Sequence, residues 1–260
     1  MSTSVFRRYS VIDGIHRNIL DNAYFVGGGS QANTGKFPVN QRQASSYSAA
    51  GYSIDRWILS ANATLTLPST GAKLTKTGSA AVSLIQKLEY TASAPVTFSA
   101  LVKVDLKAAG SADAGNLTLS LKNSSGSDIS GATVSQTASS TSTMVLLTKT
   151  YTGGTAVAQF AITLNASVPT NGYVEVIACK LEPGRHQTLA HRENGAWVLN
   201  EIPNPTEEWM RCQRFFHFYT NRPTPSTNKW QDQIPVMRVD PNVTYSPATN
   251  PTQWFFDADL

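Results

Sequence analysis

The sequence is poor in charge, since only 15% of its residues are Asp, Glu, Lys or Arg, where about a quarter is usual for a globular domain. Ser, Thr, Ala, Asn and Gly take the place of the missing charged residues. Ser, Thr and Asn compete for backbone hydrogen bonds inside a helix, so this composition favours short strands and tight turns. We therefore predict an all-β protein, and 260 residues are enough for one large sandwich, alone or with a smaller module.

Concentrated positive charge and long apolar runs are also missing. The net charge of +4 is thinly spread, and no cluster of Lys and Arg marks a surface for nucleic acid. No apolar run approaches the length of a membrane span, and the first residues lack the apolar stretch of a secretory signal. We expect no nucleic-acid partner and no membrane insertion, and a protein that is made in the cytoplasm and stays soluble.

Cysteine is scarce, with Cys179 and Cys212 far apart in the sequence. Cys179 falls in an apolar stretch, where a buried thiol is expected. A disulfide between the two is possible, but nothing in the pattern requires one. Cys212 has His217 nearby, yet a catalytic thiol also needs a base held in place by the fold. We favour a buried thiol at Cys212 over a nucleophile.

Patterns that bind metals or phosphates are incomplete. His186 and His191 are five residues apart, a spacing that does not place a pair on one helical face. Gly35-Lys36 lacks the earlier glycine and the following Ser or Thr of a phosphate loop. We predict no metal and no cofactor. A structural calcium held by Glu182 and Asp21-Asn22 stays open as an alternative.

Strands are indicated by apolar residues in strict alternation. Residues 95–106 show six of them with period two, typical of a sheet with one face in water. The same pattern recurs at 117–121, and 144–151, 157–164 and 173–181 are further candidates. The segment 82–90 fits either a strand or a helical face. This many short strands with turns between them predict a sandwich or barrel.

The pattern changes after residue 184. Asn204 suits a helix N-cap, with Pro205 at the first helical position and Glu207 at the third. A short helix over about 206–214 should follow. Beyond it, strand candidates are the segments 215–219, 234–239, 243–245 and 254–260.

Several short phrases recur here in an order typical of one group of proteins. They are Asn-Ile-Leu-Asp-Asn at 18–22, Asn-Gln-Arg at 40–42, Gly-Tyr-Ser-Ile-Asp-Arg-Trp at 51–57, Lys-Leu-Glu-Pro-Gly at 180–184, Cys-Gln-Arg-Phe-Phe at 212–216 and Pro-Val-Met-Arg at 235–238. This series resembles phage and prophage tail-fibre or head-fibre proteins with a carbohydrate-binding-module-like jelly roll.

The resemblance implies a virion location, attachment to a host-cell glycan and a homotrimer. It divides the chain into an N-terminal virion-attachment arm (1–20), a jelly-roll β-sandwich (21–183) and a small β-rich C-terminal module with one short helix (184–260). The arm would contact a capsid or tail protein of the virion. The residues expected to make that contact are Phe6, Arg7, Arg8 and Tyr9.

Aromatic residues on polar loops are the candidate glycan contacts, because loop aromatics are often exposed. They are Tyr47, Tyr52 and Trp230. Trp254, Phe255 and Phe256 are expected at the oligomer interface, where aromatics are enriched. Trp57 could also stack on a sugar, but a tryptophan that opens a strand is more often a core anchor.

The predicted function is adsorption, in which a virion fibre binds bacterial surface polysaccharide without cutting it. One alternative is a purely structural decoration protein of the virion. The other is a depolymerase, which would need two carboxylates converging on a sugar. Between 61 and 180 the acidic residues are Glu89, Asp105, Asp113, Asp128 and Glu175.

Overall fold

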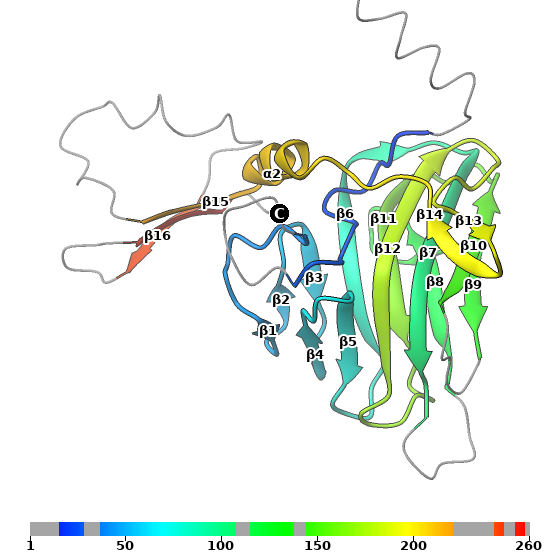
Figure 1. The fold of residues 1–260 in the computed structure, drawn as a ribbon, viewed down its shortest axis with the longest axis horizontal. Helices are drawn as coiled ribbons and strands as arrows, with labels where there is room; N and C mark the ends of the chain where they lie inside the picture. Colours follow the sequence, from blue (N-terminus) through cyan, green and yellow to red (C-terminus); the bar gives the residue numbers. More distant parts are fainter. Residues whose placement is uncertain are drawn as a thin grey trace, which may run out of the picture.

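A computed structural model describes residues 16–28, 37–107, 115–137, 144–220, 242–246 and 253–257, with side chains to residue 216. Two large antiparallel sheets face each other in this part of the chain, and one short helix lies beyond their edge (Figure 1). The described residues contain no helix long and apolar enough to cross a membrane. The expected all-β class is confirmed.

The two sheets form a jelly roll. The first has the order β1 (Ser46–Tyr47), β4 (Ala63–Thr66), β5 (Ala72–Lys76), β12 (Tyr173–Pro183), β7 (Val96–Asp105) and β10 (Val145–Tyr151). The second has the order β2 (Gly51–Tyr52), β3 (Trp57–Leu59), β6 (Val82–Ala92), β11 (Val157–Leu164), β8 (Leu117–Lys122) and β9 (Asp128–Gln136). The central strands β5-β12-β7-β10 face β6-β11-β8-β9, which is the double Greek key of a jelly roll.

Strand β7 shows where the alternating pattern succeeds and where it misleads. Its apolar positions face the core as expected, but Thr97, Ser99 and Leu101 on the other face are buried too. A hairpin of β13 (Ala190–Glu193) and β14 (Ala196–Leu199) covers this outer face, and its Ala190 packs with Leu101. The expectation of one wet face is therefore wrong for β7. The segment 82–90, whose pattern fitted either a strand or a helix, belongs to strand β6, which pairs with β3 and β11.

Trp57 anchors the core between the sheets. Its ring is fully buried, with edge-on contacts to Phe25 at 5.4 Å and Phe160 at 6.2 Å between ring centroids. The indole N–H donates to the carbonyl of Asn22 at 2.9 Å, as a buried tryptophan requires. The interpretation of Trp57 as a core anchor is confirmed.

The chain beyond the hairpin forms helix α2 (Pro205–Gln213) and a sheet of β15 (Phe216–Thr220), β17 (Gln253–Asp257) and β16 (Asn242–Ser246). The Asn204 side chain accepts from the backbone N–H of Thr206 at 2.9 Å, so the predicted N-cap is confirmed. The three strands correspond to three of the predicted ones. The strand expected at 234–239 lies outside the described residues.

Candidate functional site

Four of the sequence phrases, those at 18–22, 40–42, 51–57 and 212–216, meet at one junction between the sandwich and α2. Asn22 is its centre and is fully buried. Its side chain donates to the carbonyls of Val39 and Asp55 and accepts from the Val39 N–H, at 2.7–2.9 Å. Its own backbone N–H donates to Glu208 of α2 at 2.6 Å. One side chain therefore ties together three segments that are far apart in the sequence.

Charged groups of the same phrases pair next to Asn22. Asp21 accepts from Arg56 at 3.1 Å and forms an ion pair with Arg211 of α2. Arg211 also bonds Glu208 at 2.6 Å. Arg56 lies over the ring of Phe215, with 3.5 Å from guanidinium carbon to ring centroid. These contacts hold the end of α2 against the sandwich.

A second layer repeats this arrangement. Asp55 accepts from the backbone N–H of Gln41 at 2.9 Å and from Arg42 at 3.1 Å. Arg42 lies 3.8 Å over the ring of Phe216, and the Gln41 amide donates to the Phe216 carbonyl at 2.7 Å. The four phrases that meet here are thus mainly structural, because most of their polar side chains take part in the contacts of this junction.

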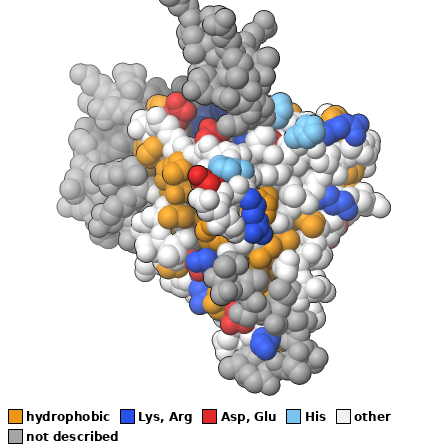
Figure 2. Space-filling model, turned by 45° about the vertical axis from the view of Figure 1, so that its right-hand side comes forward, with side chains coloured by type: hydrophobic (Ala, Val, Ile, Leu, Met, Phe, Trp, Pro, Cys, Tyr) orange, Lys and Arg blue, Asp and Glu red, His pale blue; other side chains and the backbone are white. Residues whose placement is uncertain are grey.

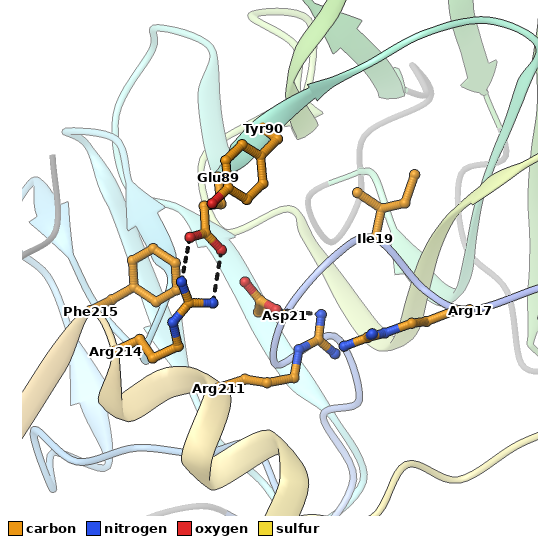
Figure 3. A pocket seen from close by; sticks show the side chains of 8 residues that line it. All are labelled: Arg17, Ile19, Asp21, Glu89, Tyr90, Arg211, Arg214 and Phe215. Carbon is orange, nitrogen blue, oxygen red and sulfur yellow. Dashed lines mark hydrogen bonds and ion pairs between the residues drawn. The ribbon is translucent and has the colours of Figure 1, made fainter. Parts of the chain in front are cut away.

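A pocket of about 170 Å³ opens beside the junction (Figure 3). Three segments build it: the chain at residues 17–21, the end of β6, and the end of α2 with Phe215. Arg214 forms a two-pronged ion pair with Glu89, with bonds of 2.6 and 3.1 Å. The residues lining it are Arg17, Ile19, Asp21, Glu89, Tyr90, Arg211, Arg214 and Phe215.

Tyr90 supplies the pocket with an exposed aromatic ring. Its side chain is 76% exposed, although it belongs to a strand whose first half is in the core. Next to it, Glu89 and Arg214 offer hydrogen-bond acceptors and donors that two mutual bonds hold in position (Figure 3). An exposed ring beside fixed polar groups is an arrangement suited to a ligand with one apolar face and several hydroxyls.

Burial shapes the ionisation of the groups behind the pocket. Burial raises the pKa of Glu208, while Arg211 and the Asn22 N–H act against that rise. For Arg211, burial alone would lower the pKa, but the Asp21 and Glu208 carboxylates raise it. Arg211 therefore stays charged at any pH in which the fold survives, and the pocket keeps a permanent cation.

The aromatic residues predicted to contact glycan lie at another part of the sandwich edge or outside the described residues. Tyr47 is half-buried, packs against the core and donates its hydroxyl to Asn40. Tyr52 is half-buried on β2, with the Arg42 guanidinium 5.5 Å from its ring centre. Trp230 lies outside the described residues. Neither Tyr47 nor Tyr52 lines the pocket, and the glycan contacts of all three residues stay a prediction.

Replacing Tyr47 with Phe should change stability in a pH-dependent way. Burial, and then the Asp55 carboxylate, raise the pKa of the Tyr47 phenol above its ordinary value of 10. A raised folded-state pKa gives stability that is complete below pH 10 and is lost as pH rises through the folded-state value. At pH 7 we expect Tyr47→Phe to cost about 1 kcal/mol for the lost hydrogen bond.

The difference in free energy of unfolding between wild type and this variant should then narrow at about pH 10.5. Only the wild type loses stability there, because the Tyr47 phenol begins to ionise in its unfolded state. Urea unfolding midpoints at the two pH values measure it. Tyr90→Phe, at an exposed ring, is the control and should move neither midpoint. A gap that stays constant between the two pH values would contradict this account of Tyr47.

The remaining predicted residues have different outcomes. Trp254, Phe255 and Phe256 belong to β17, where Phe255 pairs with Phe218 and Thr244 of the neighbouring strands. Their role in an oligomer interface is not tested by this pairing. Phe6, Arg7, Arg8 and Tyr9 lie outside the described residues.

Both cysteines are buried, as expected, and both are free, so the disulfide that the sequence left open is not formed. Burial raises the pKa of the Cys212 thiol well above its ordinary value, and the carboxylates of Asp55 and Asp21 raise it further. A thiol held in its neutral form is a poor nucleophile. Among the described residues there is no group of three His, Cys, Asp or Glu side chains placed to hold a metal. Glu182, the calcium alternative, accepts from Thr188 and lies 3.7 Å from the Lys180 ammonium.

The sequence did not reveal the pocket as a site, although Asp21 and Glu89 were considered as carboxylates with other roles. Glu89 and Tyr90 extend an apolar strand, and nothing local distinguishes their exposed end from its buried start. Arg211 and Arg214 were visible only as the charged side of a short helix. The phrase Asn-Ile-Leu-Asp-Asn at 18–22 was a partial signal of the site, because it precedes the first strand and its apolar and polar residues need packing partners elsewhere in the chain.

No protein-family model matches this sequence, and no curated protein sequence matches it. Solved structures show distant similarity. An arabinose-bound GH51 α-L-arabinofuranosidase shares 13% identity over 65% of this chain and 31% of its own, with a TM-score of 0.40. A mutant of a family 29 carbohydrate binding module shares 9% identity over 52% of this chain and 86% of its own, with a TM-score of 0.38. A low affinity xylan binding module, CBM86, from Roseburia intestinalis shares 14% identity over 46% of this chain and 83% of its own, with a TM-score of 0.33.

This chain spans less than a third of the arabinofuranosidase. Values of identity and TM-score this low carry no argument about what the chain binds, and the pocket has to be judged on its own geometry.

Proposed function

We propose that this chain is a non-catalytic glycan-binding protein of a bacteriophage fibre, and that the pocket at the end of α2 contacts the glycan. The observation that carries the proposal is Tyr90, whose ring is 76% exposed at the rim of a polar pocket. An aromatic ring left in water beside fixed charges gains by covering its face with a ligand.

A sugar ring suits this pocket because it has an apolar face and hydroxyl groups around its edge. The apolar face would lie on Tyr90. The hydroxyls would bond the free donors of Arg214 and the remaining lone pairs of Glu89, which their mutual ion pair holds in position. A pocket of about 170 Å³ is smaller than those of drug-sized ligands and has room for about one sugar unit.

Binding without cleavage is supported by the state of the two pocket carboxylates. Glycoside hydrolysis needs one carboxylic acid to give its proton to the leaving oxygen. Both oxygens of Glu89 accept from Arg214, and both oxygens of Asp21 contact arginines. The oxygens of both carboxylates are therefore engaged by arginine side chains rather than directed at a leaving oxygen.

The fibre role rests on the order of sequence phrases, and the convergence of four of them in one junction supports treating those four as a unit. Weak contacts through one sugar unit per subunit suit a homotrimer present in several copies, because linked sites multiply affinity. The N-terminal residues would attach the protein to the capsid or tail of the virion, so that it acts on the virion surface.

Binding of fluorescently labelled protein to a panel of bacterial strains and their extracted polysaccharides tests the proposal. We expect saturable binding to some strains, abolished by periodate oxidation of the glycan, and about tenfold weaker binding for Tyr90→Ala. Ile202→Ala removes another exposed apolar side chain, outside the pocket, and should bind like wild type. Tyr52→Ala and Trp230→Ala test the contacts predicted from the sequence.

Other results would favour the rivals. Wild-type protein that binds none of the strains would support a structural decoration protein. Polysaccharide that becomes shorter, with release of reducing ends, would support a depolymerase.

A further inference from the structure

The pocket that we propose for glycan carries surplus positive charge. Three guanidinium groups line it, those of Arg17, Arg211 and Arg214, against the two carboxylates of Asp21 and Glu89. The surplus is therefore one positive charge. Such a surplus in a partly enclosed pocket attracts anions more strongly than the thinly spread charge of the whole molecule does.

Arg17 is the source of the surplus. Within the described part of the chain its side chain has no hydrogen bond or ion pair. Figure 3 shows it extending across the pocket toward Arg211, which already pairs with Asp21 and Glu208. Two like charges that face each other repel unless an anion lies between them.

The donors needed to hold an anion are present. A guanidinium group has five N–H donors, and Arg211 uses only part of this number on its two carboxylates. Within the described residues, the donors of Arg17 have no protein partner and can bind a ligand. Together the two side chains can bind one planar anion from two directions, while Tyr90 covers the ring that carries it.

We infer that the pocket prefers an acidic sugar whose carboxylate lies between Arg17 and Arg211, as in a uronic acid. This inference rests on the proposed glycan-binding function and specifies its ligand. A carboxylate matches the guanidinium geometry and carries one charge, equal to the surplus. A phosphate monoester carries nearly two charges at neutral pH and would be repelled by Asp21 and Glu89.

The test compares each glycan with its own neutral form. Polygalacturonate, alginate and hyaluronan are immobilised beside samples of the same polymers whose carboxyl groups have been reduced to alcohols. Binding of the full chain is measured by biolayer interferometry at low and high salt. Arg17→Glu is the test variant, because that side chain is exposed and its loss removes no described contact. Arg192→Glu, on the β13–β14 hairpin, makes the same charge change outside the pocket.

We expect at least one acidic polymer to bind about tenfold more tightly than its reduced form, with the advantage shrinking as salt rises. Arg17→Glu should abolish that advantage, and Arg192→Glu should keep it. Equal binding of acidic and reduced polymers would leave glycan binding in place and overturn the preference for acid. Equal losses in both variants would overturn the role of the pocket, since overall charge would then explain binding. Absence of binding to every polymer, together with absence of binding to bacterial strains, would overturn the proposed function as well.

Discussion

Replacing Asn22 with Ala should destabilise the protein by about 4 kcal/mol, a large share of the 5–15 kcal/mol typical of a whole domain. The substitution removes three side-chain hydrogen bonds in a fully buried place. The Val39 and Asp55 backbone groups would then be left without these partners, at about 1–3 kcal/mol for each unsatisfied group. Asn22 also has a φ of 50°, a left-handed conformation that Asn tolerates better than Ala.

The variant Asn171→Ala separates the contribution of the side-chain hydrogen bonds from that of the left-handed backbone conformation. Asn171 has a φ of 72° and an exposed side chain, and only its backbone N–H makes a described hydrogen bond, to Lys76. We expect it to lose about 1 kcal/mol from the backbone alone. Chemical unfolding of both variants gives the comparison. Similar losses at the two positions would mean that the hydrogen bonds of Asn22 contribute little.

The sandwich was predictable because its signals are local. Alternation in residues 95–106 placed a central strand, and Asn204 with Pro205 placed the start of α2 within a residue. Trp57 could be assigned to the core because a large ring at a strand start is usually buried. Each of these inferences needs only residues within a few positions of one another.

The pocket was not predictable because it depends on long-range packing. Arg17, Tyr90 and Arg211 come from three segments, and only the pairing of β6 and the docking of α2 bring them together. The wet face expected for β7 failed for the same reason, since the hairpin that covers it is far away in sequence. The loop position of Tyr47 left exposure and packing on the core equally open, and its ring packs on the core through β1, which pairs with β4.

The junction also leads to a test of the predicted division of the chain at 183/184. A chain that ends after Glu201 lacks α2 and Phe216, so it loses the Glu208 bond to Asn22 and the Arg211 pair with Asp21. Removing one partner of a buried ion pair costs about 3–5 kcal/mol, which for a chain of this size corresponds to a fall of about 6–20 °C in the unfolding temperature.

A chain that ends after Phe216 is the matched control for this truncation. It keeps α2, the two arginine–phenylalanine contacts and the Gln41 bond to the Phe216 carbonyl. We expect it to unfold within a few degrees of the full chain, because it keeps the contacts of Glu208, Arg211, Phe215 and Phe216 with the sandwich. Thermal unfolding followed by circular dichroism compares the three chains. If both shortened chains unfolded at the same temperature, the sandwich would be independent of α2, and the junction would serve to position the pocket rather than to stabilise the fold.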